Sequence, residues 1–181
     1  DGNRSLAEST APHACLRAYF VGGRARLRFP TQGRIMTIQH PGAAGRRRVY
    51  VDMVGDLFHM GHVRFLEAAR GFGDWLVVGV LSAEVVTAYK RRPIMTLAER
   101  LAVIEACRHV DEVLPDAPYA VTVEFLDRHD IAVVVHGDDL PPKTVEEFYG
   151  QVAAAGRLRL VRYTAGISTT DLIRRVQERR R

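Results

Sequence analysis

The sequence predicts an α/β fold in which helices flank a parallel β-sheet, and two observations support this class. From residue 49 onward, short apolar runs typical of buried strands alternate with segments whose apolar residues recur at helical spacing. The first 47 residues, in contrast, are rich in Gly, Arg, Pro and Ala and show no sustained period. We therefore expect a basic, mostly disordered leader at residues 1–47 and one folded domain at residues 48–181.

The predicted elements alternate along the domain. Strands are expected where the apolar runs fall, at residues 49–51, 75–81, 112–114, 131–136 and 158–161. Helices are expected where the helical period holds, at residues 62–71, 83–89, 97–107, 121–128, 145–155 and 170–179. Alternation of this kind implies right-handed crossovers, so the carboxyl ends of the strands should share one sheet edge, where ligands bind.

Capping residues support several of the helix boundaries. Thr96 and Glu99 have the spacing of a capping box, in which each residue satisfies a free backbone N–H group of the first turn. Residues 168–171 form a variant of that box, with Asp in place of Glu. Gly71 and Gly156 suit helix C-termini, because glycine adopts the backbone conformations found there.

Charge, apolar runs and cysteine content exclude several classes of protein. Residues 1–48 hold nine arginines against two acidic residues, a net +7, so the remainder carries −2 of the total of +5. Only the leader or the C-terminal arginines could bind nucleic acid, and we interpret them as solvated tails. No apolar run approaches the ~20 residues of a membrane span. Two cysteines, Cys15 and Cys107, argue against a disulfide framework and favour a cytoplasmic protein.

The pair His59 and His62 is the most informative local feature of the chain. The pair follows the first predicted strand and stands where a helix begins, with Gly61 between the two histidines. A helix N-terminus offers free N–H groups and the positive end of the helix dipole, and a glycine lets a nucleotide approach the backbone closely. Two imidazoles at that place can donate hydrogen bonds to phosphate oxygens. The alternatives are a surface pair or two ligands of a zinc site.

Four motifs, in order, resemble one known family. Residues 56–62 (Asp-Leu-Phe-His-Met-Gly-His) look like the H-x-G-H signature of the nucleotidyltransferase superfamily. Residues 166–173 are similar to the second signature of the cytidylyltransferases that act on phosphoethanolamine, phosphocholine and glycerol 3-phosphate. Residues 108–113 and 136–139 resemble two further segments of those enzymes. The resemblance, from about residue 48 to about residue 175, implies a single Rossmann-like, doubly wound domain that transfers a nucleotidyl group and releases pyrophosphate.

The resemblance also implies roles for individual residues. Catalysis is assigned to His59, His62 and Lys90. Binding of the acceptor is assigned to Asp56, Tyr119 and His136. Binding of the nucleotide is assigned to Val54, Gly55, Gly61, Arg100, Arg108, Gly137, Asp138, Asp139, Tyr163, Thr164, Gly166, Ile167, Ser168 and Thr169. No residue is assigned as a metal ligand, and Mg²⁺ is expected to enter with CTP. The resemblance of residues 108–113 to a segment at the dimer interface of related enzymes implies a homodimer.

Several of these residues also have structural alternatives. Lys90 could be an exposed lysine of a loop, and Arg100 could pair on the surface with a residue one helical turn away. Ser168 could be a plain helix cap. Asp56 fits a turn residue and Tyr119 an aromatic at the edge of the core. The resemblance favours the phosphate role of Lys90, and both roles of Ser168 can hold together.

Three departures from the family pattern bear on specificity. Gly55 stands where the family usually has an aromatic residue, and Tyr163 where many members have an arginine, with Arg162 one residue early. Pro142 stands where the phosphocholine enzymes carry a tyrosine of an aromatic cage. We expect CTP as donor and phosphoethanolamine or a small phosphonate, rather than phosphocholine, as acceptor. The alternatives are an adenylyltransferase that uses ATP on a phosphorylated metabolite, and a catalytically silent nucleotide-binding module.

Overall fold

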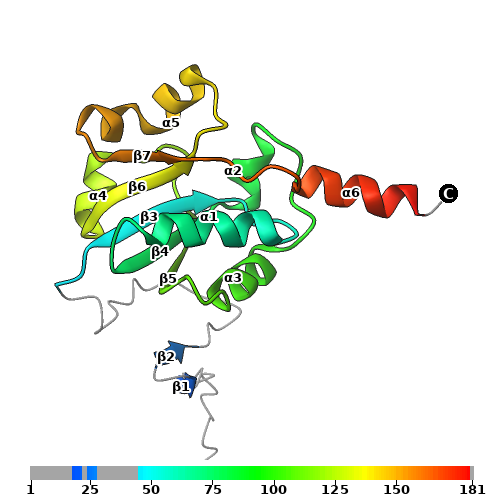
Figure 1. The fold of residues 1–181 in the computed structure, drawn as a ribbon, viewed down its shortest axis with the longest axis horizontal. Coiled ribbons are helices and arrows are strands. Elements are labelled where there is room, and N and C mark those ends of the chain that lie inside the picture. The colour runs from blue at the N-terminus through cyan, green and yellow to red at the C-terminus, as the bar shows by residue number, and fades with distance from the viewer. Residues whose placement is uncertain (1–17, 22–23, 28–44, 180–181) are drawn as a thin grey trace, which may run out of the picture. The chain divides into compact units, whose positions relative to one another are not determined.

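The computed structural model describes residues 18–21, 24–27 and 45–179. Five parallel strands form one sheet in the order β5-β4-β3-β6-β7 (Figure 1). Their bounds are β3 Arg48–Met53, β4 Trp75–Val80, β5 Glu112–Pro115, β6 Ile131–Gly137 and β7 Leu158–Val161. The first of them along the chain, β3, is central, and later strands are added on both sides. This arrangement confirms the predicted α/β fold with a Rossmann-like, doubly wound sheet.

The reversal of strand order positions the functional site. The chain winds from β3 outward through β4 to β5, and then returns to add β6 and β7 on the other side of β3. In such sheets a crevice forms at the carboxyl ends of the two strands that flank the reversal, and ligands bind there. Here those ends carry Asp52 and Met53 on β3, and His136 and Gly137 on β6.

The helices of the described chain lie close to their predicted places. Their bounds are α1 Met60–Arg70, α2 Ala83–Thr87, α3 Leu97–Glu105, α4 Val123–Arg128, α5 Pro142–Ala154 and α6 Thr169–Glu178. Helix α5 begins three residues earlier than predicted, because a proline at the first helical position needs no N–H partner. The box that begins at Thr96 caps α3 as predicted. At α6 the Ser168 side chain accepts the Asp171 N–H, but the Asp171 carboxylate accepts the Ser168 hydroxyl instead of completing the predicted box. No helix among the described residues is both long and apolar enough to cross a membrane.

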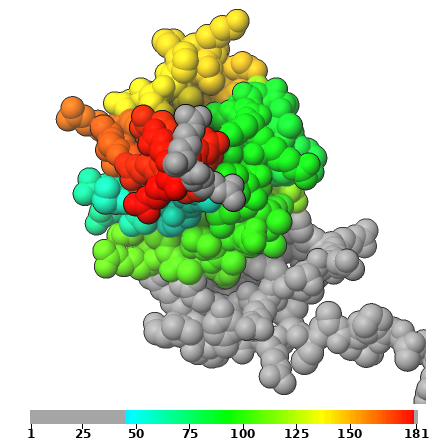
Figure 2. All heavy atoms as spheres, turned by 90° about the vertical axis from the view of Figure 1, so that its right-hand side faces the viewer, coloured from blue at the N-terminus to red at the C-terminus, as the bar shows by residue number. Residues whose placement is uncertain are grey.

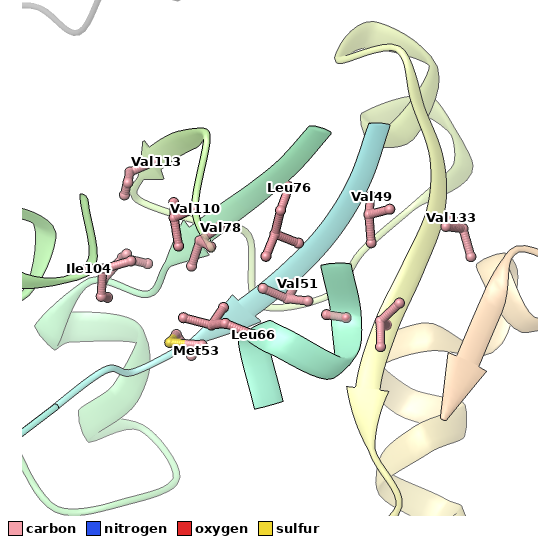
Figure 3. Close-up of a cluster of buried hydrophobic side chains, with 13 residues drawn as sticks. Val49, Val51, Met53, Leu66, Leu76, Val78, Ile104, Val110, Val113 and Val133 are labelled. Atoms are coloured by element: carbon pink, nitrogen blue, oxygen red, sulfur yellow. The ribbon is translucent and has the colours of Figure 1, made fainter. Parts of the chain in front are cut away.

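Alternate residues of the central strands face different helices. Val49, Val51 and Met53 of β3 belong to a buried cluster with Leu66 of α1 and Ile104 of α3 (Figure 3). The residues between them point the other way, toward the face that is covered by α4 and α5. Both faces of the sheet are therefore buried, as the continuous apolar character of its central strands predicts.

Tyr50 fills the second face and restricts the neighbouring strand. Its side chain is fully buried, and its ring packs edge-on against Phe125 with 5.1 Å between the ring centroids. Its hydroxyl has no hydrogen-bond partner among the described residues. A Cβ on Gly79 of β4 would lie 2.1 Å from that hydroxyl and 2.9 Å from the Cβ of Ala117. Position 79 therefore has room only for a glycine while Tyr50 keeps its place.

Two short strands lie in the segment where we predicted no regular structure. Strands β1 Ala18–Val21 and β2 Arg24–Leu27 pair antiparallel in a sheet of their own. Gly22 and Gly23 stand between them in the sequence, and a Gly-Gly pair between two short runs is a signal for a two-residue hairpin turn. Apart from residues 45–47, the remainder of the predicted leader falls outside the described residues, so the leader and its boundary at residue 47 stay predictions.

Candidate functional site

A pocket of about 510 Å³ lies at the carboxyl ends of β3 and β6. Its walls are the ends of these strands, the start of α1, the loop after α2, and the loop that joins β7 to α6. Figure 2 shows this end of the molecule, where α6 (red) projects toward the viewer between the segments around α2 and α3 (green) and the end of β7 (orange). The pocket is therefore at the sheet edge that the alternation of strands and helices predicts.

His59 and His62 cap the N-terminus of α1 with their own side chains. Nδ1 of His59 accepts a hydrogen bond from the Gly61 N–H at 3.1 Å, and Nδ1 of His62 accepts one from the His59 N–H at 3.1 Å. A neutral imidazole whose Nδ1 accepts a hydrogen bond carries its proton on Nε2. Both residues line the pocket, so each can offer its Nε2–H to a ligand bound there.

Neighbouring residues restrain both imidazole rings. The ring centroids of the two histidines lie 4.0 Å apart, and His62 stacks on Phe58 at 5.2 Å. A Cβ on Gly61 would lie 2.9 Å from Cε1 and 3.0 Å from Nδ1 of His59. Glycine at position 61 therefore permits the ring of His59 to fold back over the helix N-terminus.

Both histidines are neutral at physiological pH. Burial lowers the pKa of His59 below its ordinary value of 6.5. Burial, followed by repulsion from His59, lowers the pKa of His62 to about 4, although Asp56 acts in the opposite direction. A neutral pair can donate two N–H groups to an anion but adds no charge, so positive charge in the pocket would come from the helix dipole and from cationic side chains.

We expect the stability of the fold to depend on pH through His62. Between pH 6.5 and about 4 the unfolded chain binds a proton at this residue and the folded chain does not, so the free energy of unfolding falls as the pH falls. The two-unit step from pH 6.5 to pH 4.5 corresponds to roughly 2–3 kcal/mol. Denaturant unfolding at both pH values should show this loss in the wild type and a smaller loss in His62→Asn. Equal losses in the two proteins would contradict the assignment.

Asp56 anchors the loop that carries Lys90 and Arg91. Its carboxylate accepts hydrogen bonds from the N–H groups of Ile94 and Met95 at 2.9–3.1 Å and from the Arg91 guanidinium at 3.1 Å. Burial acts to raise the pKa of Asp56, but these hydrogen bonds and the charge of Arg91 lower it overall, so the carboxylate is ionised. Asp56 lines the pocket, yet its oxygens are occupied by the loop, which favours the structural alternative to its predicted acceptor role.

Arg100 fixes the backbone of the same region through hydrogen bonds to three carbonyl groups. It is fully buried, and one terminal guanidinium nitrogen donates to the carbonyls of Val54 at 2.7 Å and Leu81 at 2.8 Å. Its Nε donates to the carbonyl of Met95 at 3.3 Å. Arg100 thus joins the ends of β3 and β4 to the loop, while its predicted contact with the nucleotide stays a prediction.

A second carboxylate, Asp52, lies at the inner end of the pocket. It is buried and accepts a hydrogen bond from the Tyr149 hydroxyl at 2.6 Å. Burial raises the pKa of Asp52, while His136 and the Tyr149 hydroxyl act against that rise. His136 lines the pocket beside it, with its ring 5.3 Å from that of Tyr149. This end of the pocket suits a small cationic group.

Most of the predicted site residues meet in this pocket. Those that line it are Val54, Gly55, Asp56, His59, Gly61, His62, Lys90, His136, Gly137, Asp139, Tyr163, Thr164, Ile167, Ser168 and Thr169. The Thr169 hydroxyl also donates to the backbone carbonyl of Asp56 at 3.0 Å, which ties the start of α6 to the turn before His59. These residues lie close enough together to contact one ligand in the pocket. Their individual roles stay predictions.

Four further predicted residues lie outside the pocket lining, as Arg100 does. The Asp138 carboxylate accepts the Tyr163 N–H at 2.8 Å and so shapes the loop after β7. Gly166 has a φ of 93° and turns the chain toward α6. Tyr119 donates its hydroxyl to Glu147 at 2.8 Å. Arg108 is exposed beyond α3, so its contact with a second copy in a homodimer stays a prediction.

Other polar residues of the pocket were missed at the level of the sequence. Asp52, Arg91 and Arg162 line it, although none was assigned a role. Asp52 ends an apolar strand at the predicted ligand edge, which is a signal that could have identified it. Arg91 follows Lys90 directly, but spacing alone does not show which of two adjacent arginines faces the pocket.

Comparison with known proteins agrees with this geometry. A family model described as cytidylyltransferase-like matches residues 55–175. The ethanolamine-phosphate cytidylyltransferase of Arabidopsis thaliana is 42% identical over 136 residues, which cover 71% of this chain and 32% of the relative. Choline-phosphate cytidylyltransferase 2 of the same plant is 40% identical over 135 residues, 71% of this chain and 44% of the relative. The chain thus spans less than half the length of these two relatives.

A solved structure agrees with the fold. The crystal structure of the lipopolysaccharide core biosynthesis protein from Thermoplasma volcanium GSS1 aligns with a TM-score of 0.56 at 23% identity, over 68% of this chain and 100% of that chain. At that identity the similarity concerns the fold alone. The family model, in contrast, covers more than half of this chain and includes the histidine turn and the start of α6. The chain therefore belongs to the cytidylyltransferase-like family.

Proposed function

We propose that this chain transfers CMP from CTP to a small phosphorylated or phosphonate acceptor and releases pyrophosphate. The observation that carries the proposal is the pair of neutral Nε2–H donors of His59 and His62, placed at a helix N-terminus inside the pocket. Lys90 lies in the same pocket and supplies a positive charge. The names of the relatives, which are cytidylyltransferases of ethanolamine phosphate and choline phosphate, support this choice of reaction.

The proposed reaction needs positioning and charge stabilisation more than acid–base chemistry. An oxygen of the acceptor phosphate attacks the α-phosphorus of CTP, and the bond from that phosphorus to the bridging oxygen breaks, so that its electrons leave with pyrophosphate. The acceptor oxygen is already anionic near neutral pH and requires no general base. His59 and His62 donate to phosphate oxygens on which negative charge increases, and Lys90 compensates the charge of the leaving group.

The pocket favours an acceptor with a small ammonium group. We propose that Asp52, rather than Asp56, faces that group, because the Asp56 carboxylate is occupied by the loop. Pro142, at the first position of α5, offers no π-face for a trimethylammonium group, which forgoes roughly 0.5–2 kcal/mol of cation–π attraction. We therefore propose phosphoethanolamine or a small phosphonate as a better acceptor than phosphocholine.

Mg²⁺ would enter this site together with the nucleotide. Within the described part of the chain, no three His, Cys, Asp or Glu side chains are grouped so that they could hold a metal ion by themselves. Oxygens are the ligands that Mg²⁺ prefers, and it is commonly bound through substrate phosphates and one or two carboxylates. We propose that oxygens of the triphosphate supply most of the ligands of the ion. Its positive charge would assist the departure of pyrophosphate.

A matrix of nucleotides and acceptors tests the proposal. We expect pyrophosphate release with CTP and phosphoethanolamine, a lower kcat/KM with phosphocholine, and little release with ATP. Asp52→Asn should raise the KM for phosphoethanolamine more than that for glycerol 3-phosphate, whose tail is uncharged. A preference for ATP would favour the adenylyltransferase alternative. No release from any pair would overturn the proposed reaction, and a clear preference for phosphocholine would overturn the proposed acceptor.

A further inference from the structure

Arg91 lines the pocket, and the proposed function leaves it without a role. Resting on that function, we propose that Arg91 is a second phosphate-binding cation of the pocket, beside Lys90. Its ligand would be a phosphate group of a bound substrate. Two sources of that group are distinguishable by experiment, namely the polyphosphate of the nucleotide and the phosphate of the acceptor.

The geometry around Arg91 prepares its guanidinium to bind an anion. One terminal nitrogen donates to the Asp56 carboxylate at 3.1 Å, and the other donates to the carbonyl of Arg92 at 3.2 Å. A guanidinium has five N–H donors, so three remain for a ligand. The Arg91 side chain is 44% exposed and lines the pocket, so it is not shielded from a ligand there. Two hydrogen bonds therefore orient the group while leaving it able to bind.

The charge of Asp56 gives a physical reason for a cation at position 91. Asp56 is an almost completely buried, ionised carboxylate in the lining of a pocket in which phosphates are to bind. Alone, it would repel them. Arg91 compensates that charge from within the pocket lining, and a planar guanidinium matches the oxygens of a phosphate.

The neighbouring residue provides a matched control. Arg92 has the same charge, follows Arg91 directly and is exposed, but it does not line the pocket. A general effect of removing one positive charge would appear in Arg92→Gln as well as in Arg91→Gln. A specific contact with phosphate would appear only in Arg91→Gln.

Calorimetric binding with the full 181-residue chain is the first test. If the ligand is the nucleotide, Arg91→Gln should weaken the binding of CTP about tenfold or more, because it removes charge-assisted hydrogen bonds, and weaken CMP much less. If the ligand is the acceptor, CTP binding should stay unchanged and the KM for phosphoethanolamine should rise by a similar factor. In either case Arg92→Gln should stay within about twofold of the wild type, and Arg91→Lys should recover part of the loss.

Two results would overturn the proposal. One is that Arg91→Gln matches Arg92→Gln in both the nucleotide and the acceptor measurements. The other is that Arg91→Gln weakens CTP, CMP and cytidine by the same factor, since this would indicate a distorted loop and no lost phosphate contact. Thermal unfolding of both variants shows whether the loop stays anchored, because Asp56 keeps its bonds to Ile94 and Met95.

Inorganic pyrophosphate separates this proposal from the proposed function. Its binding to wild type, Arg91→Gln and Arg92→Gln requires no turnover and no particular nucleotide. If pyrophosphate binds in an Arg91-dependent way while no substrate pair releases any, the phosphate contact stands and only the proposed reaction fails. If turnover occurs as proposed while Arg91→Gln alters neither nucleotide, acceptor nor pyrophosphate binding, only the role of Arg91 fails.

Discussion

Replacing His62 by alanine is expected to lower kcat about a hundredfold to a thousandfold, and His59→Ala should have a similar effect. Each variant removes one oriented Nε2–H donor from the pocket, and the loss of one such donor to a developing oxyanion has this magnitude in other enzymes. Each also removes one cap of α1, which should reduce the free energy of unfolding by about 1 kcal/mol. The activity should therefore fall far more than the stability.

Met60, one of the two residues between the histidines, serves as the control for this comparison. Met60 is 50% exposed and does not line the pocket, so Met60→Ala should retain nearly all activity. Turnover is measured as pyrophosphate release at saturating substrates, and stability by denaturant unfolding of the same preparations. If His59→Ala or His62→Ala keeps near wild-type kcat, the residue concerned has no part in stabilising the reacting phosphates.

The largest expected effect on stability comes from Gly79→Ala, which should cost about 3 kcal/mol of unfolding free energy. The added Cβ would lie 2.1 Å from the Tyr50 hydroxyl oxygen, and neither group can move away easily, because Tyr50 is fully buried. Overpacking of a core in this way typically costs 1–3 kcal/mol and occasionally more. The measurement is chemical unfolding of the variant and the wild type.

Tyr50→Phe tests the cause of that loss. It removes a buried hydroxyl that has no partner among the described residues, so by itself it should be close to neutral. Combined with Gly79→Ala, it should recover part of the lost stability, because the atom nearest the added Cβ is gone, while the ring carbon Cζ at 2.7 Å and the Ala117 Cβ at 2.9 Å still crowd it. A double variant whose losses simply add would show that the clash does not lie at the hydroxyl.

The location of the site was predictable from the sequence because it depends on local patterns. Alternating strands and helices determine the edge at which ligands bind, and the histidine turn directly follows the first strand of the domain. The capping of α1 by His59 and His62 involves residues at most three apart. Such contacts are visible in spacing, so both the fold and the place of the histidines were predicted well.

The roles of the two aspartates were not predictable in the same way. Asp56 meets Ile94 and Met95, which lie 38 and 39 residues away, and Asp52 meets Tyr149, which lies 97 residues away. Sequence spacing places both carboxylates near the first strand but does not show which one another segment will occupy. The burial of Arg100 is a similar case, because its partner carbonyls lie 19 and 46 residues away.

The hydrogen bonds accepted at Nδ1 of the two histidines determine which group must gain or lose a proton in the proposed reaction. Because both imidazoles work in a form that persists throughout the physiological range, no proton has to be gained or lost by the protein during a turnover. The acidic limit of the reaction then belongs to the acceptor, since a phosphate monoester loses its second proton near pH 6, at about the pH where an ordinary histidine would also titrate. A fall in cellular pH would thus slow such an enzyme by reducing the concentration of its dianionic nucleophile, while the two histidines kept their neutral, donating form.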